Sequence, residues 1–232
     1  MDIVRGKEII VMSDAEFAAL RAPYTSVALD IGTGDGRYPY REARAHPTTL
    51  YIGLDATMEN LTEYSAKAGK KPNRGGLPNV LYVRAGADAL PAAFAGLAGE
   101  ITVNFPWGSL LTGLVRGEPL LLRSLAGAAR PGAAVDVYLN TAVSSEPIPL
   151  EVRNLPDVTL EYISHEMETR YAAAGILIRY AELLDGRAMA RIPSLWARRL
   201  AYGRAPETVH IRAVVQPAPP GRVEGSQPAA GT

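Results

Sequence analysis

The sequence predicts an α/β fold in which a parallel β-sheet is covered by helices on both faces. Short strand-like runs alternate with segments of helical pattern, and the connections between them are short. The strand-like runs are apolar throughout, which is typical of strands that are buried on both sides. The first of them leads into a glycine-rich turn, Gly32-Thr33-Gly34-Asp35-Gly36, directly ahead of a helical segment.

The composition is that of one large globular domain. The chain has 232 residues, of which 47% are hydrophobic, so there is ample material for a core. It has no cysteine, which excludes disulfides, thiolate zinc sites and a cysteine nucleophile. No apolar leader pattern and no apolar run of roughly 18 residues occurs, so we expect a soluble, cytoplasmic protein that does not enter a membrane. The 24 basic and 24 acidic residues balance, which argues against a uniformly basic nucleic-acid binder.

The expected elements follow in chain order, beginning with an N-terminal extension over residues 1–25. In this extension residues 7–11 have strand character, and Ser13 with Glu16 forms a capping box that predicts a helix through Leu20. Buried strands are expected at residues 27–31, 50–54, 80–83, 100–104 and 134–139. Helices are expected between them at residues 38–45, 59–68 and 119–129.

The pattern changes after Asn140. Residues 141–161 form a long connection interrupted by prolines, and a helix is predicted over residues 165–174. Two late strands are expected at residues 175–180 and 208–215, separated by a helix centred on Trp196. Residues 216–232 are rich in Pro, Gly and Ala, which predicts a disordered tail after a single domain that spans residues 1–215.

The glycine-rich turn predicts a cofactor site. Glycines let the backbone approach a ligand, and the following helix offers free N–H groups. The spacing is G-x-G-x-G with Asp30 before it, whereas dinucleotide sites follow G-x-G-x-x-G, and this favours S-adenosylmethionine (SAM) over NAD. Asp55 ends the second buried strand, where a carboxylate can accept both hydroxyls of a ribose. Asp88 follows the third strand and either contacts the exocyclic amine of an adenine or caps a turn.

A second motif, Asn104-Phe105-Pro106-Trp107, follows the fourth strand. It resembles the Asn-Pro-Pro-aromatic motif of amino-directed methyltransferases, with Phe105 in place of the first proline. It falls at the carboxyl ends of the strands, where a doubly wound fold binds its substrate. Trp107 is therefore either a flat surface on which a nucleobase stacks or a core residue. A second tryptophan, Trp196, lies in an arginine-rich run.

Two segments carry only positive charges, and each is either a solvated helix face or part of a surface for a polyanion. Within residues 65–87 the charged side chains are Lys67, Lys70, Lys71, Arg74 and Arg84, and within residues 186–206 they are Arg187, Arg191, Arg198, Arg199 and Arg204. None of the three histidines has a second ligand at metal spacing, so no metal is expected. No Ser-His-Asp set stands out, so a hydrolase is disfavoured.

Taken together, these residues resemble the aminoglycoside-resistance 16S rRNA adenine-N1 methyltransferases of the kanamycin–apramycin resistance class. The resemblance is carried by DIGTGDGR (30–37), YIGLD (51–55), KKPNRGGLPN (70–79), FPWGSLL (105–111) and SLWARRLAYGR (194–204). It implies a class I SAM-dependent methyltransferase fold: a Rossmann-like, seven-stranded sheet with an antiparallel last strand and a short N-terminal hairpin. It also implies methylation of N1 of the decoding-site adenine of 16S rRNA in the assembled 30S subunit, a modification that confers aminoglycoside resistance. The sequence does not show the oligomeric state, and a monomer is the simplest expectation for a protein that docks on a subunit.

The resemblance assigns roles to individual residues as well. Trp107 and Trp196 would sandwich the flipped adenine, and Ser194 would help to hold it. The cofactor would contact Asp30, Gly32, Thr33, Gly34, Gly36, Asp55, Ala87, Asp88, Asn104 and Pro106. The rRNA backbone would contact Lys67, Lys70, Lys71, Arg74, Arg198, Arg199 and Arg204. The chain departs from the family pattern at Asp88, where some members have glutamate, and in residues 141–161, where the family varies.

Three other functions stay open. An N6-adenine or small-molecule methyltransferase would use Asn104 to accept a hydrogen bond from the attacking amine. A weakly active or non-catalytic relative that binds rRNA would keep the same residues. A nicotinamide oxidoreductase is disfavoured by the glycine spacing.

Overall fold

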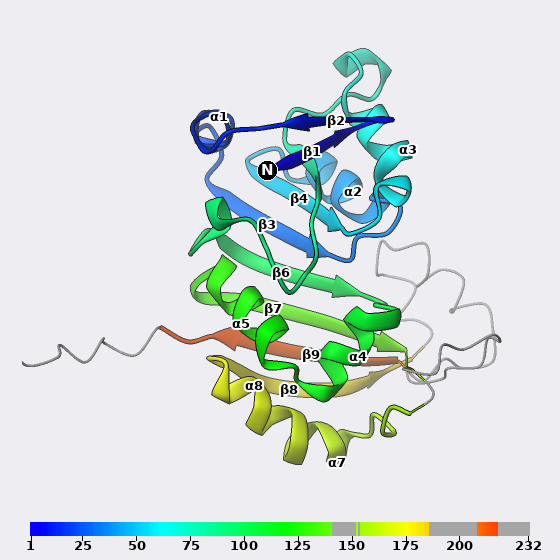
Figure 1. Ribbon diagram of the computed structural model, residues 1–232, viewed down its shortest axis with the longest axis vertical. Coiled ribbons are helices and arrows are strands. Elements are labelled where there is room, and N and C mark those ends of the chain that lie inside the picture. The colour runs from blue at the N-terminus through cyan, green and yellow to red at the C-terminus, as the bar shows by residue number, and fades with distance from the viewer. Residues whose placement is uncertain (141–151, 153, 186–207, 218–232) are drawn as a thin grey trace, which may run out of the picture.

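The computed structural model describes residues 1–140, 152, 154–185 and 208–217 as a central β-sheet between two layers of helices (Figure 1). The strands are β1 (Asp2–Arg5), β2 (Glu8–Val11), β3 (Ser26–Ile31), β4 (Thr49–Asp55), β5 (Val80–Arg84), β6 (Ala98–Asn104), β7 (Ala129–Asn140), β8 (Ile176–Leu184) and β9 (Thr208–Val215). Their order across the sheet is β2-β1-β5-β4-β3-β6-β7-β9-β8.

Seven of these strands, from β5 to β8 in the sheet order, form the expected class I arrangement. The strands β3 to β7 pair in parallel, and β9 runs antiparallel to both of its neighbours, β7 and β8. The N-terminal hairpin of β1 and β2 pairs with the edge strand β5 through Ile3 and Val83. The sheet therefore has nine strands instead of seven, because the hairpin extends it.

Helices cover both faces of the sheet (Figure 1). On one face lie α2 (Arg37–Ala45) and α3 (Met58–Ala68), which bury Tyr40, Leu61 and Tyr64 against β1, β3, β4 and β5. The opposite face carries α1 (Asp14–Arg21), α4 (Gly108–Arg116), α5 (Pro119–Ala128) and α8 (Glu168–Ala173). The shorter elements are η1 (Pro72–Arg74), η2 (Ala92–Phe94), α7 (Leu160–Tyr162) and the π-helical η3 (Ile163–Met167).

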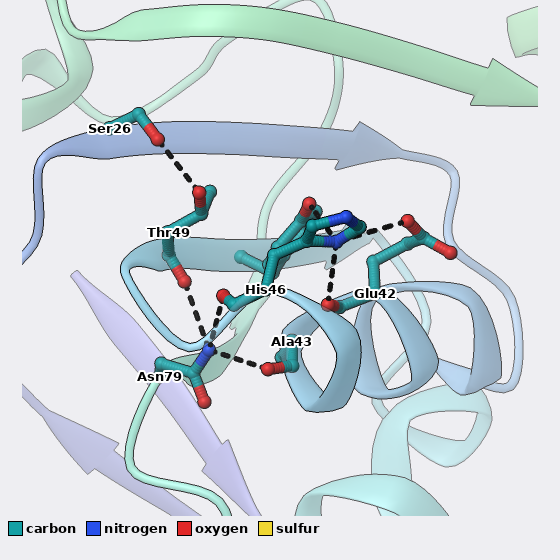
Figure 2. Close-up of polar contacts among 7 residues, drawn as sticks. Ser26, Glu42, Ala43, His46, Thr49 and Asn79 are labelled. Atoms are coloured by element: carbon teal, nitrogen blue, oxygen red, sulfur yellow. Dashed lines mark hydrogen bonds and ion pairs between the residues drawn. The ribbon is translucent and has the colours of Figure 1, made fainter.

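A buried asparagine, Asn79, ties the end of α2 to the strands beside it (Figure 2). Its amide nitrogen donates to the backbone oxygens of Ala43 at 2.8 Å, His46 at 3.2 Å and Thr49 at 3.0 Å. The last carbonyls of α2 thereby gain a donor that the helix itself cannot supply. The segment that precedes β5 is consequently anchored to α2.

Most predicted elements are found within two residues of their expected bounds, and the capping box of Ser13 and Glu16 is present. Three differences have physical causes. The helix α4 was not expected because Gly108 and Gly113 lower its helix propensity, and it is stabilised instead by the burial of Leu111, Leu114 and Val115. Strand β7 begins at residue 129, not 134, because an irregularity in its pairing with β6 accommodates Pro131.

The third difference lies in the C-terminal part. The helical segment predicted from residue 165 begins at Leu160, where Thr159 accepts a hydrogen bond from the backbone N–H of Tyr162. Strand β8 continues to Leu184, four residues past the predicted end. The expected helix around Trp196, most of the 141–161 connection and residues 218–232 lie outside the described residues.

Candidate active site

A cleft of about 790 Å³ lies at the carboxyl ends of β3, β4, β5 and β6. Parallel strands end at the same edge of a sheet, so the loops after these four strands meet there. The cleft brings together most of the cofactor and substrate residues predicted from the sequence: Asp30, Gly32, Thr33, Gly34, Asp55, Ala87, Asp88, Asn104, Pro106 and Trp107. Side chains that the sequence did not single out, among them Tyr38, Asn60 and Leu110, also line it.

The three glycines of the turn have positive φ angles but different surroundings. A Cβ atom on Gly32 would lie 2.5 Å from the side chain of Leu110, so this glycine lets α4 pack against the turn. A Cβ on Gly34 would meet nothing within 4 Å, so the backbone there faces open space. Gly36 does not line the cleft: its carbonyl accepts a hydrogen bond from Tyr82 at 2.8 Å, and it is the N-cap residue that precedes α2. Gly36 thus shapes the turn from behind.

Asp30 is buried at the base of the cleft and accepts three side-chain hydrogen bonds. Thr33 donates to Oδ2 at 2.5 Å, and Thr102 and Asn104 donate to Oδ1 at 2.9 Å each. Burial raises the pKa of this carboxyl group to about 6, although the three donors oppose the shift. Asp30 therefore connects the turn after β3 to the end of β6.

This raised pKa predicts a pH-dependent stability. Because the folded-state pKa of Asp30 is about 6 and the usual unfolded value is about 4, the folded protein binds more protons between these pH values. The wild-type protein should therefore lose about 2–3 kcal/mol of unfolding free energy, relative to Asp30→Asn, as the pH rises through this window. Urea unfolding of both proteins from pH 4.5 to 7 measures this difference. If the unfolding free energies of the two proteins change in parallel with pH, the pKa of Asp30 is not raised in the folded protein.

Asp55 connects the loops after β3 and β4. Its Oδ2 accepts from the backbone N–H of Gly34 at 3.1 Å, and its Oδ1 accepts from the N–H of Thr57 at 2.9 Å and the amide of Asn60 at 3.2 Å. These donors hold the carboxylate at the cleft and fill three of its roughly four acceptor sites, which leaves one site on Oδ2. One ribose hydroxyl can donate to that site, and a second can donate to Oδ1 in place of the exposed Asn60 amide.

Asp88 lies in a turn and also lines the cleft. The N–H of Ala89 donates to the carbonyl of Gly86 at 3.2 Å, which closes the turn, and a Cβ on Gly86 would lie 2.7 Å from Oδ1 of Asp88. Both interpretations of Asp88 from the sequence, a turn residue and a ligand contact, are compatible with this position.

Asn104 has a buried acceptor that nothing satisfies. Its amide nitrogen donates to Asp30, which fixes the orientation of the amide because the oxygen cannot face a carboxylate. The side-chain oxygen is buried without a hydrogen-bond partner. A ligand with a cationic donor, such as the ammonium group of SAM, would satisfy it. Together with the diol acceptor Asp55 and the open space at Gly34, this residue fits SAM.

Phe105 has a φ of 52°, and it is the one non-glycine residue with positive φ in the part of the chain that is described. Its N–H donates to the carbonyl of Tyr138 at 2.9 Å, and its ring stacks on the Tyr138 ring with a centroid distance of 6.3 Å. Tyr138 stacks in turn on His210 at 4.4 Å, and His210 contacts Asp136 at 2.8 Å. This column of residues, from β7 and β9, supports the start of the loop that carries Trp107.

Trp107 lies at the cleft and is 49% exposed, so it is not a core residue. The sequence did not point to Tyr138 as a support for its loop. The only signal was the alternation of polar and apolar residues around Tyr138 and His210 in the last strands. Trp196 and Ser194 lie outside the described residues.

The first basic segment lies at the end of α3 and in the loop around η1. It includes Lys67, Lys70, Lys71 and Arg74. Arg84 forms an ion pair with Asp2 at 2.6 Å and is therefore neutralised. The second segment, with Arg198, Arg199 and Arg204, falls outside the described part. Over the described ranges, no group of three metal-ligating side chains occurs, and no helix has the length and apolar character needed to cross a membrane.

Comparison with known proteins identifies relatives along nearly the whole chain. A family model described as NpmA, 16S rRNA (adenine(1408)-N(1))-methyltransferase, matches residues 2–215. A 16S rRNA (adenine(1408)-N(1))-methyltransferase from Streptoalloteichus hindustanus is 43% identical over 201 residues, covering 87% of this chain and 92% of the relative. An Escherichia coli protein of the same name is 34% identical over 205 residues, covering 88% of this chain and 94% of the relative.

Solved structures agree with these relatives. The 16S rRNA methyltransferase KamB superposes with a TM-score of 0.85 and 39% identity, over 94% of this chain and all of KamB. A mutant 16S rRNA (adenine(1408)-N(1))-methyltransferase from Catenulisporales acidiphilia, solved with cosubstrate SAM, gives a TM-score of 0.86 and 37% identity, over 95% of this chain and all of that one. The cleft, its SAM-compatible donors and acceptors, and these relatives lead to one conclusion: the chain belongs to the family of SAM-dependent 16S rRNA (adenine(1408)-N(1))-methyltransferases.

Proposed function

We propose that this protein methylates N1 of adenine 1408 in the 16S rRNA of the assembled 30S subunit, and that this modification confers aminoglycoside resistance. The observation that carries the proposal is one continuous cleft that joins Asp55 and Asn104, which suit SAM, to the exposed Trp107, which suits a base. We further propose that the protein acts as a monomer in the cytoplasm, with one catalytic domain over residues 1–215. The family match over residues 2–215 supports that boundary.

Different residues of the cleft would bind different parts of SAM. Bound SAM supplies a methyl group on a positively charged sulfonium. Asp55 accepts hydrogen bonds from the ribose hydroxyls, the free oxygen of Asn104 accepts from the ammonium group, and Asp88 accepts from the adenine amine. Gly32, Thr33, Gly34, Ala87 and Pro106 shape the walls, and Asp30, at the base of the cleft, orients Thr33 and Asn104.

The reaction needs positioning more than proton transfer. The N1 atom of adenine has an in-plane lone pair and is unprotonated at neutral pH, so it forms the new bond to carbon without a general base. The electron pair of the broken carbon–sulfur bond stays on sulfur, and the positive charge passes to the adenine ring. Trp107 and Trp196 would hold that ring between their faces and stabilise its charge by cation–π attraction, with Ser194 positioning the base. Because N1 is paired inside a duplex, the base must leave its stack.

The rRNA backbone would be held by the two basic segments. Lys67, Lys70, Lys71 and Arg74 supply one set of phosphate contacts, and Arg198, Arg199 and Arg204 supply the other. Such contacts position the enzyme on folded RNA without reading sequence.

Primer extension across adenine 1408, on rRNA from bacteria that express this chain, tests the proposal. A methyl group on N1 blocks the Watson–Crick edge and stops reverse transcriptase, so a strong new stop is expected. The stop should be absent with Trp196→Ala, which retains the cofactor residues. Absence of the stop in wild type, when SAM binds normally, would contradict N1 methylation.

One observation favours a second candidate, an N6-adenine methyltransferase. The unpartnered oxygen of Asn104 could accept a hydrogen bond from a 6-amino group instead of from an ammonium group. An N6 methyl group leaves the base able to pair, so reverse transcriptase would read through. A nucleoside with the mass of methyladenosine and no stop at adenine 1408 would identify this alternative.

A further inference from the structure

A second concave site lies in the groove between α2 and α3, on the face of the sheet that these helices cover. It encloses about 510 Å³ and is lined by Arg37, Tyr40, Arg41, Arg44, Ala45, Tyr64 and Lys67. None of these residues lines the cofactor cleft. Four of the seven are cations, and none is an acid. The groove is therefore a basic pocket separate from the site of the reaction.

The arginines of this groove share one side of α2. Positions 37, 41 and 44 are spaced by four and three residues, which places them in one row along the helix. Like charges at these spacings repel one another and destabilise a helix by about 0.2–0.5 kcal/mol per pair. Arg37 is partly compensated by Asp35, whose Oδ2 lies 3.6 Å from its Nε. Arg41 and Arg44 form no ion pair with a carboxylate anywhere in the described ranges.

Two tyrosine rings fix the cations on the α3 side. Lys67 Nζ lies 4.4 Å from the centre of the Tyr40 ring and 5.2 Å from that of Tyr64. The guanidinium of Arg37 lies 5.6 Å from the centre of the Tyr64 ring, and the two rings pack edge to face. Lys67 has no carboxylate partner among the residues described. Aromatic faces thus hold its charge in place without neutralising it.

The lysine-rich loop after α3 is tied to the same groove. The Tyr40 hydroxyl donates to the carbonyl of Gly75 at 2.5 Å, and Asn79 donates to the carbonyl of Ala43 near the end of α2 (Figure 2). The loop is compact, because a Cβ on Gly76 would lie 1.6 Å from the carbonyl oxygen of Lys70. The charges of Lys70, Lys71 and Arg74 are consequently held beside those of α2.

We infer that the α2–α3 groove is a phosphate-binding site for rRNA that continues the first basic segment onto α2, with Arg41, Arg44 and Lys67 as its main phosphate contacts. The inference rests on the proposed function and extends its RNA surface to α2. At about 1.5 Å of rise per residue, Arg37 and Arg44 are about 10 Å apart along the helix, a row that suits a phosphate chain better than one small anion. The groove is lined by cations and tyrosine rings and by no Asn, Gln, Asp or Glu side chain, and the contacts that we infer for its cations are with phosphates, which carry no sequence information.

The test is the double substitution Arg41→Ala/Arg44→Ala in the full chain. Filter binding to 30S subunits from 50 to 200 mM KCl should show about 10- to 100-fold weaker binding at the lower salt. The slope of log K against log salt should become shallower by about 1.4–1.8, for two lost phosphate contacts. Single-turnover methylation at saturating subunits should stay within about twofold of wild type, because phosphate contacts position the RNA and take no part in the chemistry. The midpoint of thermal unfolding should not fall, because both side chains are exposed.

A matched control removes two positive charges from helices on the opposite face of the sheet. Arg21→Ala/Arg123→Ala changes two exposed arginines on α1 and α5 and should leave binding and salt slope unchanged. A second variant, Arg41→Lys/Arg44→Lys, retains both charges and should recover most of the affinity.

The outcomes separate the two proposals. If the alanine variant binds subunits with the affinity and salt slope of wild type, the groove is not an rRNA site, and wild-type methylation still supports the proposed function. If it loses binding of inorganic phosphate or ATP but not of subunits, the groove is a small-anion site and the inference is wrong. If wild type binds subunits through the groove but leaves adenine 1408 unmodified, the proposed function fails while the groove assignment stands.

Discussion

Replacing Trp107 by alanine should lower the single-turnover rate of methylation at least about 100-fold and leave the affinity for SAM within about threefold of wild type. In the proposed role the indole would supply base stacking of about 1–3 kcal/mol and a cation–π contribution of about 1–2 kcal/mol as the ring becomes charged. Both terms act on the base, whereas the SAM contacts proposed above lie on Asp55, Asn104 and Asp88. Rapid-quench kinetics with 30S subunits and calorimetric titration with SAM separate the two effects.

Two companion variants define the role of the indole. Trp107→Phe keeps an aromatic face and should recover a large part of the rate. Leu160→Ala removes an apolar side chain that is 43% exposed and outside the cleft, and it should change neither quantity. If Trp107→Ala loses SAM affinity as strongly as it loses rate, the tryptophan is part of the cofactor site instead.

Asp55→Ala should show the opposite pattern, with SAM binding at least about 100-fold weaker and a rate at saturating SAM that recovers to within severalfold of wild type. Two hydrogen bonds from the ribose to a charged acceptor contribute about 1.5–3 kcal/mol each, and the N–H groups of Gly34 and Thr57 also lose their acceptor. Steady-state kinetics in SAM concentration should therefore show a raised KM with little change in kcat.

The control for this prediction is Glu59→Ala, which removes one exposed carboxylate from α3, outside the cleft. It should bind SAM as wild type does. Equal SAM affinity in Asp55→Ala and Glu59→Ala would rule out Asp55 as the ribose acceptor.

The sequence predicted those parts of the site that depend on local pattern. Unbroken apolar runs located the buried strands, and the position of Asp55 and Asn104 at strand ends placed both at one edge of the sheet. The glycines of the turn were identified as a group, but their separate roles were not. Only the surroundings of Gly36, with Tyr82 packed against it, show that it lies behind the cleft.

Contacts between distant strands could not be predicted in the same way. Asp30 meets Thr102 because β3 and β6 are neighbours in the sheet, although more than 70 residues separate them in the chain. The same holds for the stack of Tyr138 on His210 across β7 and β9. The groove between α2 and α3 could not be predicted from the sequence either. Three arginines spaced along one helix do not by themselves show which neighbouring surface they face.

The backbone of Phe105 has a consequence for how the base is captured. A left-handed conformation at such a residue costs on the order of 1–3 kcal/mol, and it persists here because a backbone hydrogen bond and the stack on Tyr138 hold it. The backbone at the start of the loop that carries Trp107 is therefore fixed when the protein folds. If Trp107 binds the base as proposed, little further free energy is needed to order this side of the site. The rearrangement would then fall on the RNA, whose base has to unstack to reach the tryptophan.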